Sequence, residues 1–364
     1  MITWLLRMGL CAAPIAPSDA DEEAAITFVE SVGGRFAHNN AGQLTAVDLR
    51  NAWITDADLG KLATLPNLEN INLAYTKITD LGLEQLTPLE NVKVLNLRYA
   101  EYVSDVGISH LKHWRNLEYL NLRGTKVTST VFEHVSKMTK LKFLDVGHSR
   151  VSDELIENLA DLDQLESFSF GGNKMSGVAF PLLKLLPALR KLNIGTRQRT
   201  DSGQWSVAVT DFNIDKIAQL EQLEVLELSD AVISDRGVAK LARLKNLHTL
   251  DLSNTRVTGR GIAALAELPN LRRLTLSRTE GIDDEAIPQF LELKRLEMLD
   301  LTQSNITGVG LLKLAQHDGL KQLFIGDVES TTEQIASVRQ AMPGCAISWW
   351  KSPEIDVPDG ARDR

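Results

Sequence analysis

The sequence predicts a single right-handed α/β solenoid, in which short parallel strands line a concave sheet and helices cover the convex side. Three observations carry this prediction. A leucine pattern recurs twelve times, the spacing of apolar residues changes from two to three inside each recurrence, and a helix-capping residue marks the change.

The recurring pattern is L-x-x-L-x-L, and we number the positions of each unit from its first residue. The twelve units begin at Leu44, Leu68, Val92, Leu117, Leu141, Leu165, Leu189, Leu223, Leu247, Leu271, Leu296 and Leu320. Successive starts are 24 or 25 residues apart, except for one interval of 34. One unit cannot bury its apolar stripe alone, so the units must stack around a continuous leucine core.

Each unit is expected to be a short strand followed by a helix. Apolar positions four and six are two apart, as in a strand, whereas positions sixteen, nineteen and twenty-two are three apart, as on one helical face. Position twelve carries Ser, Thr or Asp, whose side-chain oxygen can accept the unpaired N–H groups of a helix start. The eleven examples are Thr55, Thr79, Ser104, Thr128, Ser152, Ser176, Thr210, Ser234, Thr258, Asp283 and Thr307.

Both ends of the array are expected to be capped. Residues 21–43 predict an N-terminal cap, with a helix over 21–34 that turns Ile26, Val29 and Val32 inward and a strand over 35–38. The array itself covers 44–343.

At the C-terminal end, residues 332–341 predict the last helix and residues 344–350 a final strand. Cys345 is expected to be a buried, unreactive side chain in that strand. Residues 351–364 lack periodicity and predict a disordered tail.

Residues 1–20 predict a signal peptide or, alternatively, a disordered start. A short apolar run precedes Ser18-Asp19-Ala20, which offers small residues for cleavage. A lipid anchor at Cys11 is a third possibility, which bulky Leu10 disfavours. Cleavage would make the protein extracytoplasmic or secreted, and without it the protein would be cytoplasmic. No segment is apolar enough over a sufficient length to predict a transmembrane helix.

The units contain the motif T-x-[IV]-[TS]-D-x-G and resemble the short 24-residue type of the leucine-rich repeat family. Similar units occur in F-box leucine-rich-repeat proteins, in the ribonuclease-inhibitor-like group and in exported bacterial proteins. The resemblance covers residue 44 to about residue 350 and implies a horseshoe-shaped solenoid. No F-box-like segment is present, and the unit is shorter than the alternating units of ribonuclease inhibitor. Neither a ubiquitin-adaptor nor an inhibitory activity is therefore implied.

The composition and the motifs give no indication of catalysis or of metal binding. Net charge is -9, which disfavours a nucleic-acid partner, and two cysteines cannot form a disulfide framework or a Cys-rich zinc site. His110 and His113 share one helix but lack a third ligand, and His317 replaces a core leucine. We find no catalytic motif, and we expect no enzyme activity, no cofactor and no metal.

Tyrosine and arginine gather on the concave side of the first units and predict a ligand-binding patch. These residue types often anchor protein interfaces, and only 5% of the chain is aromatic. The patch consists of Arg50, Tyr75, Arg98, Tyr99, Tyr119, Arg123, Phe143 and His148. A plain solvated face is the alternative.

The long interval of 34 residues places an insertion at 196–208, which replaces the usual three residues after the strand of unit seven. Arg197, Arg199 and Trp205 would project at the rim of the solenoid as a second ligand-binding element. A loop that packs on its neighbours is the alternative.

These features together predict a non-enzymatic, monomeric interaction scaffold that binds a protein or peptide through its concave face. Recognition of glycan or cell-wall material by an exported module is the second hypothesis. It would be favoured if Tyr75, Tyr99, Tyr119 and Trp205 were exposed beside polar neighbours.

Overall fold

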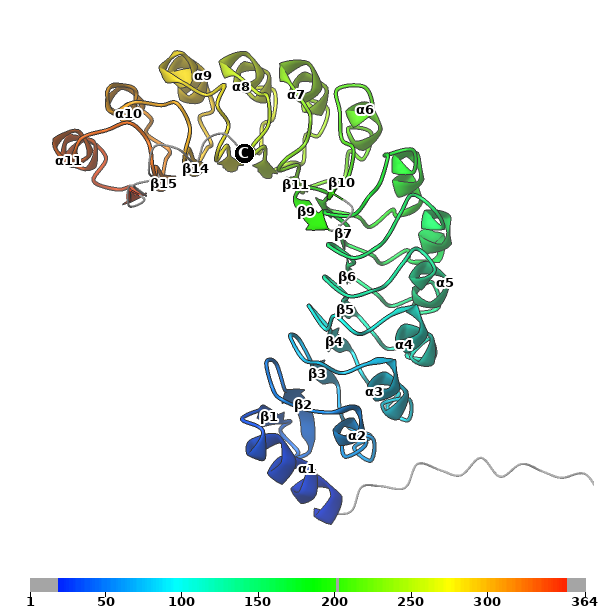
Figure 1. Ribbon diagram of the computed structural model, residues 1–364. Coiled ribbons are helices and arrows are strands. Elements are labelled where there is room, and N and C mark those ends of the chain that lie inside the picture. The colour runs from blue at the N-terminus through cyan, green and yellow to red at the C-terminus, as the bar shows by residue number, and fades with distance from the viewer. Residues whose placement is uncertain (1–18, 201–202, 352–364) are drawn as a thin grey trace, which may run out of the picture. The chain divides into compact units, whose positions relative to one another are not determined.

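The computed structural model describes residues 19–200 and 203–351, which divide into two compact parts between residues 141 and 142, each built of repeated strands and helices (Figure 1). The predicted leader lies outside the described residues except for Asp19 and Ala20, which belong to the first helix. The predicted tail also lies outside them, apart from Lys351. Below, the residues up to 141 are the first part and those from 142 onward are the second part, and the word unit refers to a single repeat.

In the first part, one sheet has the order β1-β2-β3-β4-β5, and β1 alone is antiparallel to its neighbour. Its strands are β1 (Arg35–His38), β2 (Leu44–Asp48), β3 (Asn70–Asn72), β4 (Val94–Asn96) and β5 (Tyr119–Asn121). Its helices are α1 (Asp19–Ser31), α2 (Asp56–Leu59), α3 (Asp80–Gln85), α4 (Asp105–His110) and α5 (Val131–Val135). Helices α2 to α5 follow one another along the opposite side from the sheet (Figure 1).

In the second part, the parallel sheet has the order β6-β7-β8-β11-β12-β13-β14-β15-β16. Its strands are β6 (Phe143–Asp145), β7 (Ser167–Ser169), β8 (Lys191–Asn193), β11 (Val225–Glu227), β12 (Thr249–Asp251), β13 (Arg273–Thr275), β14 (Met298–Asp300), β15 (Gln322–Phe324) and β16 (Ala346–Ser348). Its helical segments are η1 (Ile156–Asp161), η2 (Phe180–Leu185), α6 (Ile214–Ile217), α7 (Asp235–Leu241), α8 (Gly259–Leu265), η3 (Asp284–Ala286), α9 (Ile287–Glu292), α10 (Gly308–Leu314) and α11 (Thr332–Ala341).

The apolar positions build the core as the spacing predicts. Positions four and six are buried in every unit, as Leu95 and Leu97 of the third unit show with 0% exposure. Trp114 occupies position twenty-two of that unit, where most other units carry leucine, and it is also fully buried. The prediction of a strand and helix solenoid is thus confirmed within each part.

Several local predictions need correction. The helices of the fifth and sixth units, η1 and η2, are 3-10 rather than α-helical. Pro181 in the first turn of η2 removes a backbone donor, and Leu155 enters η1 from a left-handed conformation with φ of 61°. In α1, Ala25, Phe28 and Val29 are buried, whereas Ile26 is only half-buried.

Position twelve caps the helices and also joins neighbouring units. The hydroxyl of Thr79 accepts the N–H of Leu81 at 3.3 Å, and the same hydroxyl donates to Asp56 of the preceding unit at 2.7 Å. The N–H of Thr79 donates to that carboxylate as well, at 2.7 Å. This arrangement repeats in pairs Asp80–Ser104, Asp105–Thr128, Asp153–Ser176, Asp211–Ser234, Asp235–Thr258 and Asp284–Thr307. We call it the aspartate ladder.

The ladder explains the glycine of the repeat motif. A Cβ atom at Gly82 would lie 2.6 Å from Oδ1 of Asp56 and 3.0 Å from Leu59, closer than real Cβ atoms approach such neighbours. The aspartate of one unit therefore reaches its partner only because the first turn of the next helix contains a residue that lacks a side chain.

Position eight of every unit, the second residue beyond the strand leucine of position six, adopts a left-handed backbone with φ between 51° and 76°. The twelve residues are Asn51, Tyr75, Tyr99, Gly124, His148, Gly172, Thr196, Asp230, Asn254, Arg278, Gln303 and Asp327. Each one turns the chain away from the sheet, so that positions nine to eleven form a separate edge.

Candidate functional site

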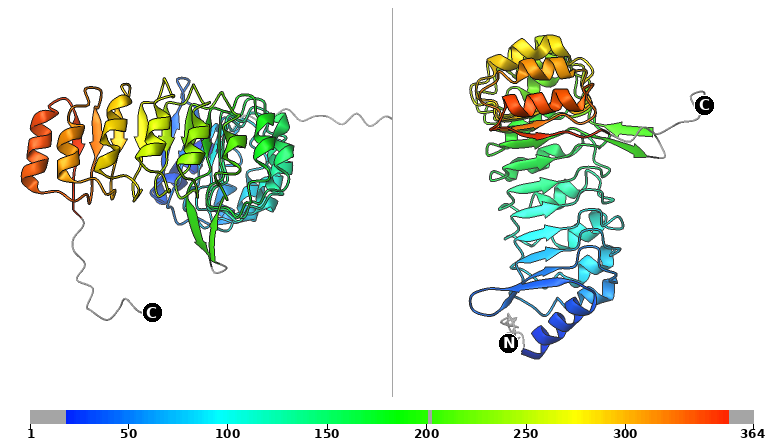
Figure 2. Two further views of the ribbon diagram at one scale, coloured as in Figure 1. Left: turned by 90° about the horizontal axis from the view of Figure 1, so that it is seen from above. Right: turned by 90° about the vertical axis from the view of Figure 1, so that its left-hand side faces the viewer.

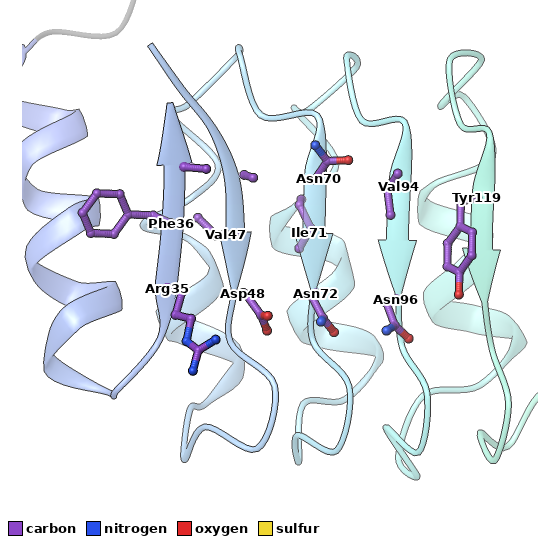
Figure 3. Close-up of a pocket in the computed structure, with 12 residues that line it drawn as sticks. Arg35, Phe36, Val47, Asp48, Asn70, Ile71, Asn72, Val94, Asn96 and Tyr119 are labelled. Atoms are coloured by element: carbon purple, nitrogen blue, oxygen red, sulfur yellow. The ribbon is translucent and has the colours of Figure 1, made fainter. Parts of the chain in front are cut away.

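The exposed face of the first part carries a shallow hollow of about 390 Å³ over strands β1 to β5 (Figure 3). Its lining is mainly apolar and includes Ala37, Ala46, Val94 and Tyr119. Three of these side chains occupy position three of their units, and strand pairing sets Val94 opposite Tyr119. A hollow with an apolar floor on an open sheet suits an extended ligand rather than a deeply enclosed substrate.

A row of polar side chains borders this floor at position five. Asp48, Asn72 and Asn96 stand in register on β2, β3 and β4, and all three line the hollow. Oδ1 of Asn72 accepts the N–H of Ala74 at 3.1 Å, and Oδ1 of Asn96 accepts the N–H of Arg98 at 3.1 Å. These bonds fix the amides and close the turn after each strand.

The amide nitrogens of this row remain available. Within the described residues, Nδ2 of Asn72 and Nδ2 of Asn96 donate to no protein acceptor, whereas Nδ2 of Asn121 donates to the hydroxyl of Tyr119 at 3.4 Å. Two oriented donors therefore border an apolar floor. Such donors can bind the carbonyl oxygens of an extended chain.

Asp48 is held by the predicted patch residue Arg50. The guanidinium donates to both carboxylate oxygens, with Nε at 2.8 Å and Nη2 at 2.5 Å from Oδ2. Burial raises the pKa of Asp48, but the hydrogen bonds and charge of Arg50 outweigh it, and Arg35 adds to the attraction, so the pKa is lowered overall. Arg50 thus neutralises the edge of the hollow, and it is less available to a ligand than the sequence suggests.

The other predicted patch residues of the first part do not share one surface with the hollow. Only Tyr119 lines it. Tyr75 and Tyr99 stand in the left-handed turns, where their rings stack with centroids 5.3 Å apart and planes at 22°. Arg98 is exposed beside Tyr99, with its guanidinium 5.6 Å from the ring centroid, and Arg123 is half-buried.

Phe143 and His148 belong to the second part. Phe143 is half-buried on β6, and His148 stands in a left-handed turn with Nε2 3.0 Å from Oγ1 of Thr196. That contact makes His148 a neighbour of the insertion.

The insertion is an ordered hairpin, in which β9 (Arg197–Thr200) pairs with β10 (Gly203–Ser206) and projects from the edge of the second part (Figure 2). Arg197 donates to the carbonyl of Asp230 at 3.1 Å and so anchors the hairpin to the next unit. Arg199 is exposed, whereas Trp205 is half-buried opposite Gln198. Of the three predicted residues, Arg199 presents its side chain most openly.

The second part differs in charge at position five. Glu227 and Asp251 stand on the adjacent strands β11 and β12, and Asp300 stands on β14 beyond Thr275 of β13, whereas β3 to β5 of the first part carry amides at this position. Burial raises the pKa of Asp251, the hydrogen bonds from Ser253 oppose this, and the charges of Asp300 and Asp230 add to the rise, so the pKa is raised overall. These carboxylates disfavour the binding of an anion nearby, and burial and mutual repulsion disfavour the ionised form of Asp251.

The residues considered for chemistry have structural partners. His113 contacts the carbonyl of Thr87 through Nε2 at 2.8 Å, and buried His317 contacts that of Leu293 at 3.1 Å. Cys345 is half-buried rather than buried, and burial raises the pKa of its thiol. Among residues 19–200 and 203–351, no three His, Cys, Asp or Glu side chains are grouped to hold a metal ion, and no helix could cross a membrane.

Some surface residues escaped the sequence analysis. Arg35 and Phe36 line the hollow from β1, which lies outside the repeat and gives no repeat signal. Asn72 and Asn96 stand at position five, where a polar residue is equally expected on a plain solvated face. Trp53 and Tyr102 are 84% and 48% exposed at the edge beyond the strands, and their exposure was the missing signal.

A family model described as leucine-rich repeat matches residues 221–242 and 243–266. A comparison with curated proteins gives no match. Among solved structures, an internalin (inlF) from Listeria monocytogenes is 20% identical with a TM-score of 0.58, and the alignment covers 93% of this chain and 98% of that one.

Two receptors are also similar in fold. The ectodomain of the receptor kinase GASSHO1/SCHENGEN3 from Arabidopsis thaliana, in complex with CASPARIAN STRIP INTEGRITY FACTOR 2, is 17% identical with a TM-score of 0.50. TLR13, in complex with ssRNA13, is 18% identical with a TM-score of 0.51. The alignments cover 87% and 84% of this chain but only 43% and 44% of the receptors. The repeat pattern and the matched family model are consistent with a leucine-rich-repeat protein, and the similar solved structures show the same fold.

Proposed function

We propose that the protein is a non-enzymatic interaction scaffold that holds an extended segment of a protein or peptide on the concave sheet of its first part. The observation that carries the proposal is the hollow of about 390 Å³, whose apolar floor lies beside the donors of Asn72 and Asn96. An apolar ligand side chain would fill the floor while the amides bind its backbone carbonyls. The plant ectodomain of the same fold was solved with a bound ligand, which supports this use.

A library of displayed random peptides tests this proposal when it is selected against the full chain. The binding of one selected peptide is then measured for wild type and for Val94→Arg, which places a charge in the floor. Val225→Arg is the matched control, because Val225 is also a half-buried valine at position three, in the second part. We expect Val94→Arg to weaken binding at least about tenfold and Val225→Arg to leave it unchanged.

Replacing Asn96 by Ala separates backbone recognition from simple apolar contact. Loss of its donor and of the turn contact to Arg98 should weaken peptide binding about three- to tenfold. Selection of no peptide, or equal loss with Val94→Arg and Val225→Arg, would exclude the hollow as the binding site.

The remaining predicted residues form a secondary proposal, in which Arg98, Arg123, Phe143, His148 and the hairpin 197–206 extend the contact. Arg199 and Trp205 are its testable members. Binding of the same peptide to Arg199→Ala and Trp205→Ala variants should fall if the hairpin takes part, and unchanged binding would restrict the site to the sheet.

Export is also proposed, on the basis of residues 1–20 alone. Expression of the full chain in a bacterial host, followed by fractionation and N-terminal sequencing, tests it. A mature protein that begins near residue 21 outside the cytoplasm is expected, and an uncleaved cytoplasmic chain would contradict it.

The second hypothesis, recognition of glycan or cell-wall material by an exported module, receives less support from the aromatic residues on which it depends. Of the four aromatic residues on which it depends, Tyr75 is 48% exposed, but Tyr99, Tyr119 and Trp205 are half-buried.

A further inference from the structure

The edge beyond the strands of the first part carries a second surface, distinct from the hollow. We define this loop surface by Trp53, Tyr75, Lys77, Tyr99, Tyr102 and Lys126, which lie at positions eight to eleven of four consecutive units. It holds three of the four tyrosines in the chain. The concentration of rings on adjacent loops singles out this edge from the rest of the described surface.

Rings and amines alternate along the loop surface. Nζ of Lys77 lies 4.7 Å from the ring centroid of Trp53, and Nζ of Lys126 lies 5.0 Å from that of Tyr102. Between these two pairs lies a hollow of about 310 Å³, lined by Tyr75, Thr76, Lys77, Tyr99, Glu101 and Tyr102. Trp53 is 84% exposed, and Tyr75 and Tyr102 are each 48% exposed. Flat apolar faces and cations thus meet solvent together.

The charge of this edge opposes that of the whole chain. Segments 50–54, 74–78, 98–103 and 123–127 contain five Lys and Arg residues and one acidic residue, Glu101, whereas the chain has a net charge of -9. Within the described part of the chain, no ion pair engages Lys77, Arg98 or Lys126. Positive charge without a partner in an acidic protein favours an anionic ligand.

The backbone supports a binding role for two of the rings. Tyr75 and Tyr99 adopt left-handed conformations with φ of 59° and 54°, where a bulky residue is unfavourable and Asn or Gly is preferred. Several other units have Asn, Asp or Gly at this position. The two strained tyrosines are retained where their rings stack beside the 310 Å³ hollow.

We propose that the loop surface binds an anionic polysaccharide. Sugar rings have apolar C–H faces that stack on Trp53 and Tyr102, while carboxylate or sulfate groups at their edges pair with Lys77 and Lys126. The rings stand on successive loops of a solenoid, so a linear polymer can follow them from one unit to the next.

Two other anionic polymers fit less well. Bases of a single-stranded nucleic acid would stack on exposed ring faces, but two of the rings, Tyr75 and Tyr99, already stack on each other with centroids 5.3 Å apart. An acidic peptide would use the amines but has no general need for three exposed rings. Both are kept as outcomes of the test.

Binding of the full chain to polygalacturonate is the first measurement, with dextran, poly-L-glutamate and oligothymidylate as comparison probes. We expect polygalacturonate to bind most tightly, more weakly as salt increases, and dextran not to bind. Trp53→Ala and Tyr102→Ala should each weaken polygalacturonate binding about tenfold while leaving the weak binding of poly-L-glutamate unchanged.

Charge variants sharpen the test. Lys77→Glu and Lys126→Glu should each weaken polygalacturonate binding at least about tenfold, whereas Glu101→Gln should strengthen it about two- to threefold by removing the opposing carboxylate. Phe212→Ala is the matched control for exposed aromatics, because Phe212 is 93% exposed in the second part. This variant should leave polygalacturonate binding unchanged. Thermal unfolding checks that every variant remains folded.

Failure of this proposal is distinguishable from failure of the peptide site. Val94→Arg alters the concave hollow and should leave polysaccharide binding unchanged. Tighter binding of oligothymidylate or poly-L-glutamate than of polygalacturonate, or no loss with Trp53→Ala, would overturn the polysaccharide assignment. So would the absence of polygalacturonate binding.

Discussion

The two parts of the molecule have the same kind of leucine core but differ in the residues that they expose on the sheet and on the loops. Positions four and six are equally buried in both, yet position five holds amides in β3 to β5 and carboxylates in β11, β12 and β14. The loops of the first part combine exposed rings with lysine amines, at Trp53 and Tyr102, whereas the second part has a projecting hairpin. The same repeat therefore supports one stack of leucines and two different surfaces, because the outward positions contribute little to the core.

The connections between units differ as well. In the first part, three successive aspartates, Asp56, Asp80 and Asp105, bind the next unit. In the second part, glycine replaces the ladder aspartate at Gly177, Gly259 and Gly308. The unit after Gly259 carries Asp283 at position twelve, so an aspartate in place of Gly259 would face a second carboxylate. At Gly259 the ladder is thus interrupted where the following unit carries a carboxylate in place of a hydroxyl.

Removal of one ladder carboxylate should have the largest effect. Asp80→Ala removes two charge-assisted hydrogen bonds to Ser104, at 2.7 and 2.6 Å, and leaves its N–H without an acceptor. We expect the free energy of unfolding to fall by about 2–3 kcal/mol, as measured by urea denaturation. Glu84→Ala, an exposed residue of the same helix, is the control and should change it by less than about 0.5 kcal/mol.

The equivalent change in the second part tests whether the ladder works equally in both. Asp235→Ala breaks matching bonds to Thr258 at 2.8 Å and should cost a similar amount. A loss below about 1 kcal/mol in either variant would show that leucine packing alone joins the units.

Acid should weaken the ladder. Burial raises the pKa of Asp211, but hydrogen bonds from Ser234 and from the N–H of Gly237 lower it by more, so its pKa in the folded state lies below the ordinary value. The stability that it contributes is fully present above the unfolded-state pKa, about 3.9, and is lost as pH falls through the lower folded-state pKa.

The variant Asp211→Asn isolates this contribution. We expect it to lower the free energy of unfolding by about 1–2 kcal/mol at neutral pH and by less as the pH drops below about 4. Denaturation across that pH range is the measurement, and a difference that stays constant with pH would contradict the assignment.

The carboxylates of the second sheet should show the smallest effect, with the opposite sign. Since the folded-state pKa of Asp251 is raised, its ionisation costs stability as pH rises through that pKa. Asp251→Asn keeps an oxygen for the N–H of Ser253 and should stabilise the protein by about 0.5–1 kcal/mol at neutral pH. Thermal unfolding at neutral and acidic pH should show that the gain disappears in acid.

The leucine spacing was sufficient to predict the strands. Apolar residues two apart share one face of a strand and those three apart share one face of a helix, so few other structures would bury both sets. Residues 332–341 were assigned to the last helix, where α11 lies. Helix type was harder, since η1 and η2 depend on the conformation of Leu155 and on Pro181 rather than on spacing.

The candidate site was predicted less well than the fold. Tyr119 was identified, but Tyr75 and Tyr99 were placed on the sheet side, because spacing does not reveal that position eight turns the chain away. Trp53 and Tyr102 were missed because exposure depends on how neighbouring loops pack. Arg35 and Phe36 come from a strand outside the repeat.

The left-handed turn has a further consequence for how such a protein changes over time. Twelve equivalent turns form an alignment within one chain, in which Asn51 and Asn254 show what the backbone prefers and Tyr75 and Tyr99 depart from it. Replacing either tyrosine by asparagine would relax the backbone by about 1 kcal/mol and remove a ring from the surface. Mutational drift without selection for binding would therefore move these turns toward asparagine or glycine.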